Sequence, residues 1–221
     1  MFKNRTEAGR KLAEFFDHIN GKNAVVYALP RGGVVIGAEI AKTIHAPLDL
    51  IITRKIGHPS QPEYAIGALA ENGHSVFNKE EGLNINEHYL TTETEKQRKE
   101  AGRRRKAYLS ERKPILCAGK TAILVDDGIA TGLTVKAAVK ELRLHYSPKK
   151  IIVAVPVAPK DTVNELEQEG IEVLAILTTK DFLGAIGAYY QDFAAVEDED
   201  VIRMIKETER YSHISKTREY A

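Results

Sequence analysis

Short apolar runs that alternate with segments of helical periodicity are the feature that most limits the folds open to this sequence. Runs of strand length lie at residues 24–29, 48–53, 122–125, 151–155 and 171–177, and helical segments separate most of them. Strands that are apolar on both faces and are joined through helices are typical of a parallel sheet with both faces covered. The sequence therefore predicts an α/β fold: a five-stranded parallel sheet with helices on both faces.

The helices themselves are expected at residues 7–18, 34–44, 131–144 and 160–169, because apolar residues recur there every three or four positions. Thr6 is the expected N-cap of the first helix. A chain of 221 residues has the length of one α/β domain with an addition, so we expect a single domain over residues 1–221.

The alternation is interrupted between residues 54 and 121. This stretch holds turn residues, two short strand candidates at 65–69 and 74–77, and a highly charged helical segment at about 87–109. We expect a flexible loop and a charged helix inserted into the domain. The basic run at residues 103–106 is expected on an exposed face of that helix.

The charge balance argues against a general affinity for polyanions. The chain has 32 Lys and Arg against 31 Asp and Glu, so nucleic acid and anionic membranes are not expected partners, and an anion must be bound by a local cluster. The single cysteine, Cys117, rules out an intramolecular disulfide, and no segment has the length and apolarity of a signal peptide or a membrane span. We expect a cytoplasmic protein.

Two adjacent carboxylates, Asp126 and Asp127, close the apolar run at 122–125, and a turn of small residues then opens a helix. Parallel sheets bind ligands at the carboxyl ends of their strands, and a helix N-terminus presents unpaired amides to a phosphate. Thr131 and Thr134 add hydroxyl donors. Beside a phosphate the two carboxylates need hydroxyl groups or a hydrated cation, and a phosphorylated ribose with Mg²⁺ satisfies both demands. The alternative is an ordinary turn in which the Asp pair is solvated and Thr131 is an N-cap.

The string VDDGIATGLT at residues 125–134 resembles the binding signature of the type I phosphoribosyltransferases, in which two acidic residues end an apolar strand and a Thr-Gly-x-Thr loop follows. The resemblance implies the type I phosphoribosyltransferase fold over residues 25–177 and binding of phosphoribosyl pyrophosphate. It also implies that Mg²⁺ is held through the ligand and water, without a direct protein ligand. The residues it implies for ribose 5-phosphate are Asp126, Asp127, Gly128, Ile129, Ala130, Thr131, Gly132, Leu133 and Thr134.

A second loop, LPRGG at residues 29–33, follows the first apolar run. Its glycines let amides approach an anion, and the guanidinium of Arg31 suits phosphate oxygens. In the family this loop binds pyrophosphate and often contains a cis peptide bond, so the resemblance implies that role for Arg31, Gly32 and Gly33. It also singles out the Pro30–Arg31 bond, although Leu29–Pro30 is the easier bond for a cis isomer. A dinucleotide-binding fingerprint is disfavoured, because the G-x-G-x-x-G spacing is absent.

Arg54 and Lys55 end the second apolar run, where they would add positive charge for the pyrophosphate leaving group; a solvated basic pair is the alternative. Glu63 is the candidate acid or base near the acceptor, under a flap that excludes water. The candidate catalytic residues are therefore Asp126, Asp127, Arg31, Lys55 and Glu63.

The segment RKIGHPSQPEYAIGA at residues 54–68 completes a resemblance to stand-alone bacterial and archaeal phosphoribosyltransferase-like proteins. It implies transfer of ribose 5-phosphate to a nitrogenous base with release of pyrophosphate; the alternative is a regulatory module that senses phosphoribosyl pyrophosphate or a nucleotide. Enzymes that act on hypoxanthine or guanine carry an aspartate at the position of Ala130, so the resemblance disfavours those bases and leaves the acceptor open. A homodimer is the expected assembly.

A hood over the acceptor is expected from residues 178–221 together with the N-terminal helix. Tyr189, Tyr190 and Phe193 either stack on the base or pack together. Cys117 is interpreted as a small apolar filler. No metal-ligand spacing relates the histidines, which are interpreted as structural or surface residues: His18, His45, His74, His88, His145 and His213.

Overall fold

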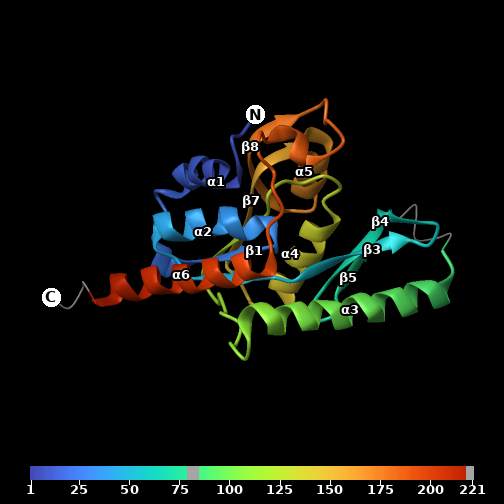
Figure 1. The fold of residues 1–221 in the computed structure, drawn as a ribbon, viewed down its shortest axis with the longest axis horizontal. Coiled ribbons are helices and arrows are strands. Elements are labelled where there is room, and N and C mark those ends of the chain that lie inside the picture. The colour runs from blue at the N-terminus through green and yellow to red at the C-terminus, as the bar shows by residue number, and fades with distance from the viewer. Residues whose placement is uncertain (79–84, 218–221) are drawn as a thin grey trace.

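The computed structural model describes the backbone of residues 1–78 and 85–217, and the side chains of residues 1–78 and 85–211. Its larger sheet has five strands in the order β2-β1-β6-β7-β8, all parallel to their neighbours, which confirms the predicted sheet. Helices cover both of its faces (Figure 1). The strands are β1 (Ala24–Ala28), β2 (Leu48–Leu50), β6 (Thr121–Val125), β7 (Lys150–Pro159) and β8 (Glu172–Thr179). The helices around them are α1 (Arg5–Ala13), α2 (Gly32–Ile44), α4 (Leu133–His145), α5 (Lys160–Gln168) and α6 (Asp198–Thr217).

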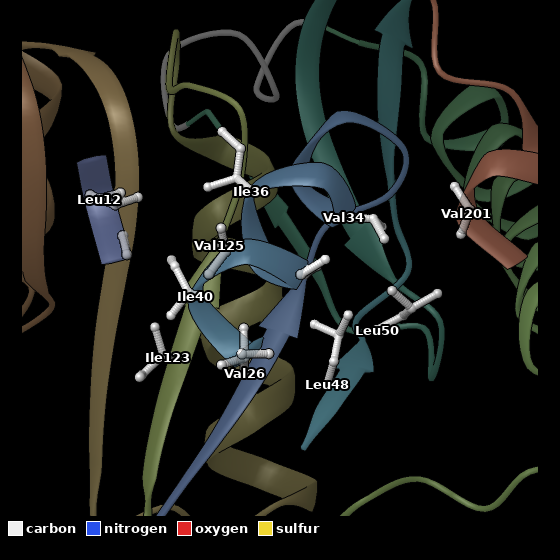
Figure 2. Packing of buried hydrophobic residues seen from close by; sticks show 14 of the residues in the cluster. Leu12, Val26, Val34, Ile36, Ile40, Leu48, Leu50, Ile123, Val125 and Val201 are labelled. Atoms are coloured by element: carbon white, nitrogen blue, oxygen red, sulfur yellow. The ribbon is translucent and has the colours of Figure 1, made fainter. Parts of the chain in front are cut away.

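Alternating side chains divide each strand between two apolar cores. Val26 and Ile123 point to the face covered by α1, α2 and α6, where they pack among residues such as Ile40 and Val201 (Figure 2). The neighbouring side chains of the same strands point to the other face and pack against α4 and α5. Both faces are therefore buried, which is why the strand sequences are apolar without interruption.

A smaller antiparallel sheet occupies part of the stretch between β2 and β6. Its strands are β3 (Thr53–His58), β4 (Gln61–Ala70) and β5 (Ser75–Phe77), and the long helix α3 (Glu87–Leu109) packs along β3 and β4 (Figure 1). The two strand candidates and the charged helix are confirmed. The described part of residues 54–121 thus holds a three-stranded sheet beside the helix, where we expected a flexible loop and a charged helix; residues 79–84 lie outside the described residues.

The predicted strand at 48–53 is wrong in its second half. β2 ends at Leu50, and the chain enters the smaller sheet at Thr53. Ile51 and Ile52 between them are buried in the two different cores. One continuous apolar run therefore spans the junction of two sheets, which periodicity alone does not reveal.

Several helix boundaries also differ from the prediction. The first helix ends at Ala13 and continues as a 3₁₀ turn to Phe16, and Asn4, not Thr6, caps it by accepting a hydrogen bond from the backbone amide of Glu7. The fourth helix begins at Leu133, two residues later than predicted, because Gly132 has φ +73° and lies in the left-handed region. The expected N-cap Thr131 consequently lies in the loop.

The first residues of the chain pair with the segment 186–194. The amide of Phe2 donates to the carbonyl of Tyr189 over 2.8 Å, and the Tyr190 ring contacts the rings of Phe2 and Phe193 with centroids 5.4 and 4.9 Å apart. Tyr189 and Tyr190 are both buried, so the packing alternative is confirmed for these two. Residues 218–221 of the expected hood lie outside the described residues. No helix in the described part of the chain is long and apolar enough to cross a membrane.

Candidate functional site

Asp126 and Asp127 lie where β6 ends, at the carboxyl edge of the larger sheet. The amide of Asp127 donates to Oδ1 of Asp126 over 2.8 Å. Oδ2 of Asp127 accepts a hydrogen bond of 2.8 Å from Nε of Arg5, and both side chains of this ion pair are largely buried. The carboxylate pair is therefore held in place by its own backbone and by the N-terminal helix.

The surroundings of the Asp126 carboxyl perturb its pKa. Burial, followed by the negative charge of Asp127, holds the pKa of the Asp126 carboxyl well above its usual range. A ligand or cation that favours the charged form of this carboxyl lowers its pKa, so binding of such a ligand is coupled to loss of the proton.

The loop at residues 29–33 lies directly against these carboxylates. The amide of Leu29 donates to the carbonyl of Val125, and a Cβ placed on Gly32 would lie 1.9 Å from Oδ2 of Asp127. Only a glycine permits that approach. The Pro30–Arg31 peptide bond is cis, which confirms the bond singled out by the sequence. Two motifs more than ninety positions apart therefore share one site.

Residues 128–134 connect the carboxylates to α4. The loop is tied down by the amide of Ile129, which donates to Val157, and by the Thr162 hydroxyl, which donates to the carbonyl of Ala130. The helix begins at Leu133 without a side-chain cap. The amides of its first turn therefore have no partner within the helix and are available to an anion.

Arg31 projects from its loop toward the start of α6. Its Nη1 lies 3.1 Å from Oε2 of Glu197 and 3.6 Å from Oδ1 of Asp198, and all three side chains are exposed. Such exposed pairs contribute little to stability, so the Arg31 guanidinium can exchange these carboxylates for a more highly charged anion.

Arg54 and Lys55 are adjacent in β3 and so point to opposite faces of the smaller sheet. Nε of Arg54 donates to Gln97 of α3 over 2.9 Å, whereas Nζ of Lys55 donates to Oε2 of Glu63 over 2.7 Å. Lys55 is paired in register with Ala68, which packs against Leu133 of α4. Lys55 is therefore on the face that α4 covers and Arg54 is not. Glu63 is almost fully exposed, and its contact with Lys55 lowers the pKa of its carboxyl.

The sequence did not single out two groups that contact the site: Arg5 on Asp127, and Glu197, the acidic residue directly before α6. Tyr190, which we expected either to stack on the base or to pack, also contacts the site, because its hydroxyl donates to the carbonyl of Asp127 over 2.6 Å. The one local signal was the run of acidic residues at 197–200; the contacts of Arg5 and Tyr190 depend on how the two termini pair.

Two further expectations are decided by burial. Cys117 is buried and confirmed as a core residue. Arg103 and Lys106 are exposed, and Arg104 is half-buried. Arg105 is largely buried, forms an ion pair with Glu71 and donates to the carbonyl of Leu50. The expectation of an exposed basic run therefore holds for Arg103 and Lys106 and is wrong for Arg105, because α3 turns that residue toward the turn after β4.

Comparisons with known proteins agree with this architecture. A model of the phosphoribosyl transferase domain matches residues 3–192. Two Mycobacterium tuberculosis proteins, from strains CDC 1551 / Oshkosh and H37Rv, carry the name "putative phosphoribosyl transferase" and are each 38% identical over 212 residues, covering 95% of this chain and 47% of theirs. This chain thus spans about half the length of the curated relatives it matches. The crystal structure of TT1426 from Thermus thermophilus has 38% identity and a TM-score of 0.77, covering 93% of this chain and 98% of that chain.

Proposed function

This chain belongs to the family of proteins with a phosphoribosyl transferase domain, and we propose that it binds phosphoribosyl pyrophosphate with Mg²⁺ and transfers ribose 5-phosphate to a nitrogenous base, releasing pyrophosphate. The observation that carries the proposal is the contact between the Asp126–Asp127 pair and the Arg31–Gly33 loop, beside the open amides of residues 128–134. Negative and positive groups placed side by side fit a ligand that has hydroxyl groups at its centre and phosphates at both ends.

The 5-phosphate is assigned to residues 128–134. The amides at the start of α4 and the hydroxyls of Thr131 and Thr134 are the donors, and the helix adds a partial positive charge. Gly132 is the residue whose left-handed backbone turns the loop into the helix. This part of the site positions the substrate and takes no part in bond changes.

The ribose hydroxyls are assigned to Asp126 and Asp127. In the described contacts Oδ1 of Asp126 accepts from the amide of Asp127, and Oδ2 of Asp127 accepts from Arg5. The other oxygen of each carboxylate is left for a sugar hydroxyl or for water around a cation. Their charges also stabilise the positive charge that develops on the ribose ring as the bond from C1 to pyrophosphate breaks.

The pyrophosphate is assigned to Arg31 with the amides of Gly32 and Gly33, and to Lys55 from the smaller sheet. Arg54 was expected beside them; its hydrogen bond to Gln97 favours a role in holding α3 to β3, and pyrophosphate contact would require that bond to open. Asp126 and Asp127 would hold Mg²⁺ through water, and the bound ion would supply positive charge beside the departing pyrophosphate.

The nitrogen of the base forms the new bond to C1 and gives up its proton. Glu63 is the candidate to receive that proton, because it is a carboxylate on the same small sheet as Lys55 and is held by it. The acceptor is a planar nitrogenous base, and segment 186–194 lies beside Asp127 through Tyr190, where a hood over the base is expected.

The test is Mg²⁺-dependent release of pyrophosphate from phosphoribosyl pyrophosphate over a panel of nitrogenous bases, with Arg31→Ala as the matched loss-of-function variant. Release with one base, abolished in the variant, supports the transferase. Saturable binding with no release on any base contradicts it and supports the alternative of a sensor for phosphoribosyl pyrophosphate or a nucleotide.

A further inference from the structure

Three side chains from two parts of the chain meet at the C-terminal end of α4: His74, Glu141 and His145. One donor atom from each lies within 4.8 Å of the others. Glu141 and His145 are four positions apart and share one face of α4, and His74 comes from the turn between β4 and β5. The expectation that His74 and His145 are unrelated is therefore wrong, because packing of the smaller sheet on α4 joins residues 71 positions apart.

Glu141 is the buried member of this His–Glu–His cluster. Its side chain is fully buried, and Oε1 accepts a hydrogen bond from Nδ2 of Asn72. Oε2 is buried and has no hydrogen-bond partner among the described residues. A buried carboxylate oxygen without a partner destabilises the folded state by its lost hydration, and a bound cation would remove that penalty.

The two histidines approach each other through the atoms that bind metals. Their Nε2 atoms are 2.7 Å apart, a contact that requires one of the two nitrogens to carry a proton. A metal ion bound to both would replace that proton and release it to water. Two nitrogens on a tetrahedral zinc lie about 3.3 Å apart, so the rings need to separate by roughly half an ångström. His145 is exposed at the helix end and His74 lies in a turn, so both have room for this adjustment.

We propose that His74, Glu141 and His145 bind one divalent transition-metal ion of the zinc class. Two imidazoles and one carboxylate suit zinc and its neighbours, whereas Mg²⁺ prefers oxygen ligands and water. With three protein ligands, one coordination position is left for water. Asn72 would hold the carboxylate in place from outside the ligand set.

This site is separate from the one assigned to phosphoribosyl pyrophosphate. His145 lies eleven positions after Thr134, which corresponds to about 16 Å along α4. The metal would instead join the turn between β4 and β5 to α4, the helix that follows the 5-phosphate loop. The smaller sheet to which this turn belongs also carries Lys55, in β3. The role of the metal is to fix the position of that sheet on α4, and it does not depend on the proposed function.

The experiment uses the chain of residues 1–221 without a histidine tag, stripped of metal with a chelator. Zn²⁺ is titrated against a chromophoric chelator, and Co²⁺ is titrated while its visible absorption is followed. We expect one Zn²⁺ per chain, a Co²⁺ spectrum with ligand-field bands, no competition from millimolar Mg²⁺, and a rise in Tm of about 5–10 °C at Zn²⁺ concentrations near 100 times Kd.

His145→Ala removes an exposed ligand and should weaken Zn²⁺ binding by at least about 100-fold while the circular dichroism spectrum is kept. His88→Ala, on the exposed start of α3, is the matched control and should bind as the parent does. Equal Zn²⁺ affinity in the parent and in His145→Ala would overturn the site, and effective competition by Mg²⁺ would overturn the class of metal. Neither result bears on the pyrophosphate-release assay, so failure here is distinguishable from failure of the proposed function.

Discussion

Arg5 holds Asp127: Nε of the arginine donates to Oδ2 of the aspartate over 2.8 Å, across 122 positions of sequence. The Arg5 guanidinium also lies 3.6 Å from the centroid of the Phe193 ring and donates to the carbonyl of Ala194. One side chain thus ties together the N-terminal helix, the end of β6 and the segment that covers it.

Arg5→Ala should destabilise the protein by about 2 kcal/mol, because it leaves a largely buried carboxylate beside Asp126 without its partner. Urea denaturation measures the free energy of unfolding. Arg10→Ala on the same helix removes an exposed pair with Glu39 and should change that free energy by less than about 0.5 kcal/mol. Equal losses in the two variants would contradict the structural role given to Arg5.

Replacing Asp126 and Asp127 together by Asn should leave the fold intact and lower the affinity for phosphoribosyl pyrophosphate by about 100-fold or more, since each charge-assisted hydrogen bond contributes about 1.5–3 kcal/mol. Calorimetric titration in the presence of Mg²⁺ measures this. Asp181→Asn, at an exposed position after β8, is the control and should bind normally. Unchanged affinity in the double variant would refute the ribose assignment.

Arg31→Ala should weaken binding of phosphoribosyl pyrophosphate about 10- to 100-fold through loss of a charge-assisted contact. Glu197→Gln should do the reverse, strengthening binding by up to about fivefold, because the exposed pair that competes for Arg31 is removed. Opposite shifts in Kd are the expected signature. If both variants weaken binding equally, the Arg31–Glu197 pair supports the site and does not compete with the ligand.

Gly32→Ala should abolish ligand binding, because its Cβ would lie 1.9 Å from Oδ2 of Asp127 and displace the carboxylate or the loop. Gly102→Ala, within α3 and with no atom within 4 Å of the added carbon, should instead raise the Tm by about 2–4 °C through helix propensity. Thermal melts and calorimetry on both variants check the pair. Normal binding by the Gly32 variant would rule out the close approach of the two motifs.

The raised pKa of Asp126 predicts how the affinity for phosphoribosyl pyrophosphate changes with pH. The free protein holds this proton to a higher pH than usual, and ribose hydroxyls with Mg²⁺ favour the charged carboxylate. Affinity should therefore increase as pH rises through the raised pKa, and binding below it should release a proton.

Calorimetry in buffers of different ionisation enthalpy measures that proton release. In Asp126→Asn the contribution of the Asp126 carboxyl is lost, and the titration of the ligand phosphates remains. Proton uptake on binding, or an unchanged pH profile in the variant, would be the contrary result.

Much of the fold follows from local pattern. Apolar runs and helical spacing predicted the five parallel strands, and the end of the run at 122–125 placed Asp126 and Asp127 at the edge of the sheet. Side-chain alternation also implies that Arg54 and Lys55 face opposite ways, a consequence that their description as one basic pair overlooked. The run at 48–53 failed as a single strand, because β2 ends at Leu50 and the chain enters the smaller sheet at Thr53, while Ile51 and Ile52 between the two strands stay buried.

Sequence by itself determined the type and order of most elements and placed Asp126 and Asp127 after a strand, since backbone hydrogen bonding and the direction of each side chain depend on near neighbours. The tertiary structure alone decided which of those ends meet: Arg5 with Asp127, Arg31 with Glu197, and His74 with His145. Such contacts join residues far apart in the chain and arise only when sheets and helices pack, so no local pattern contains them.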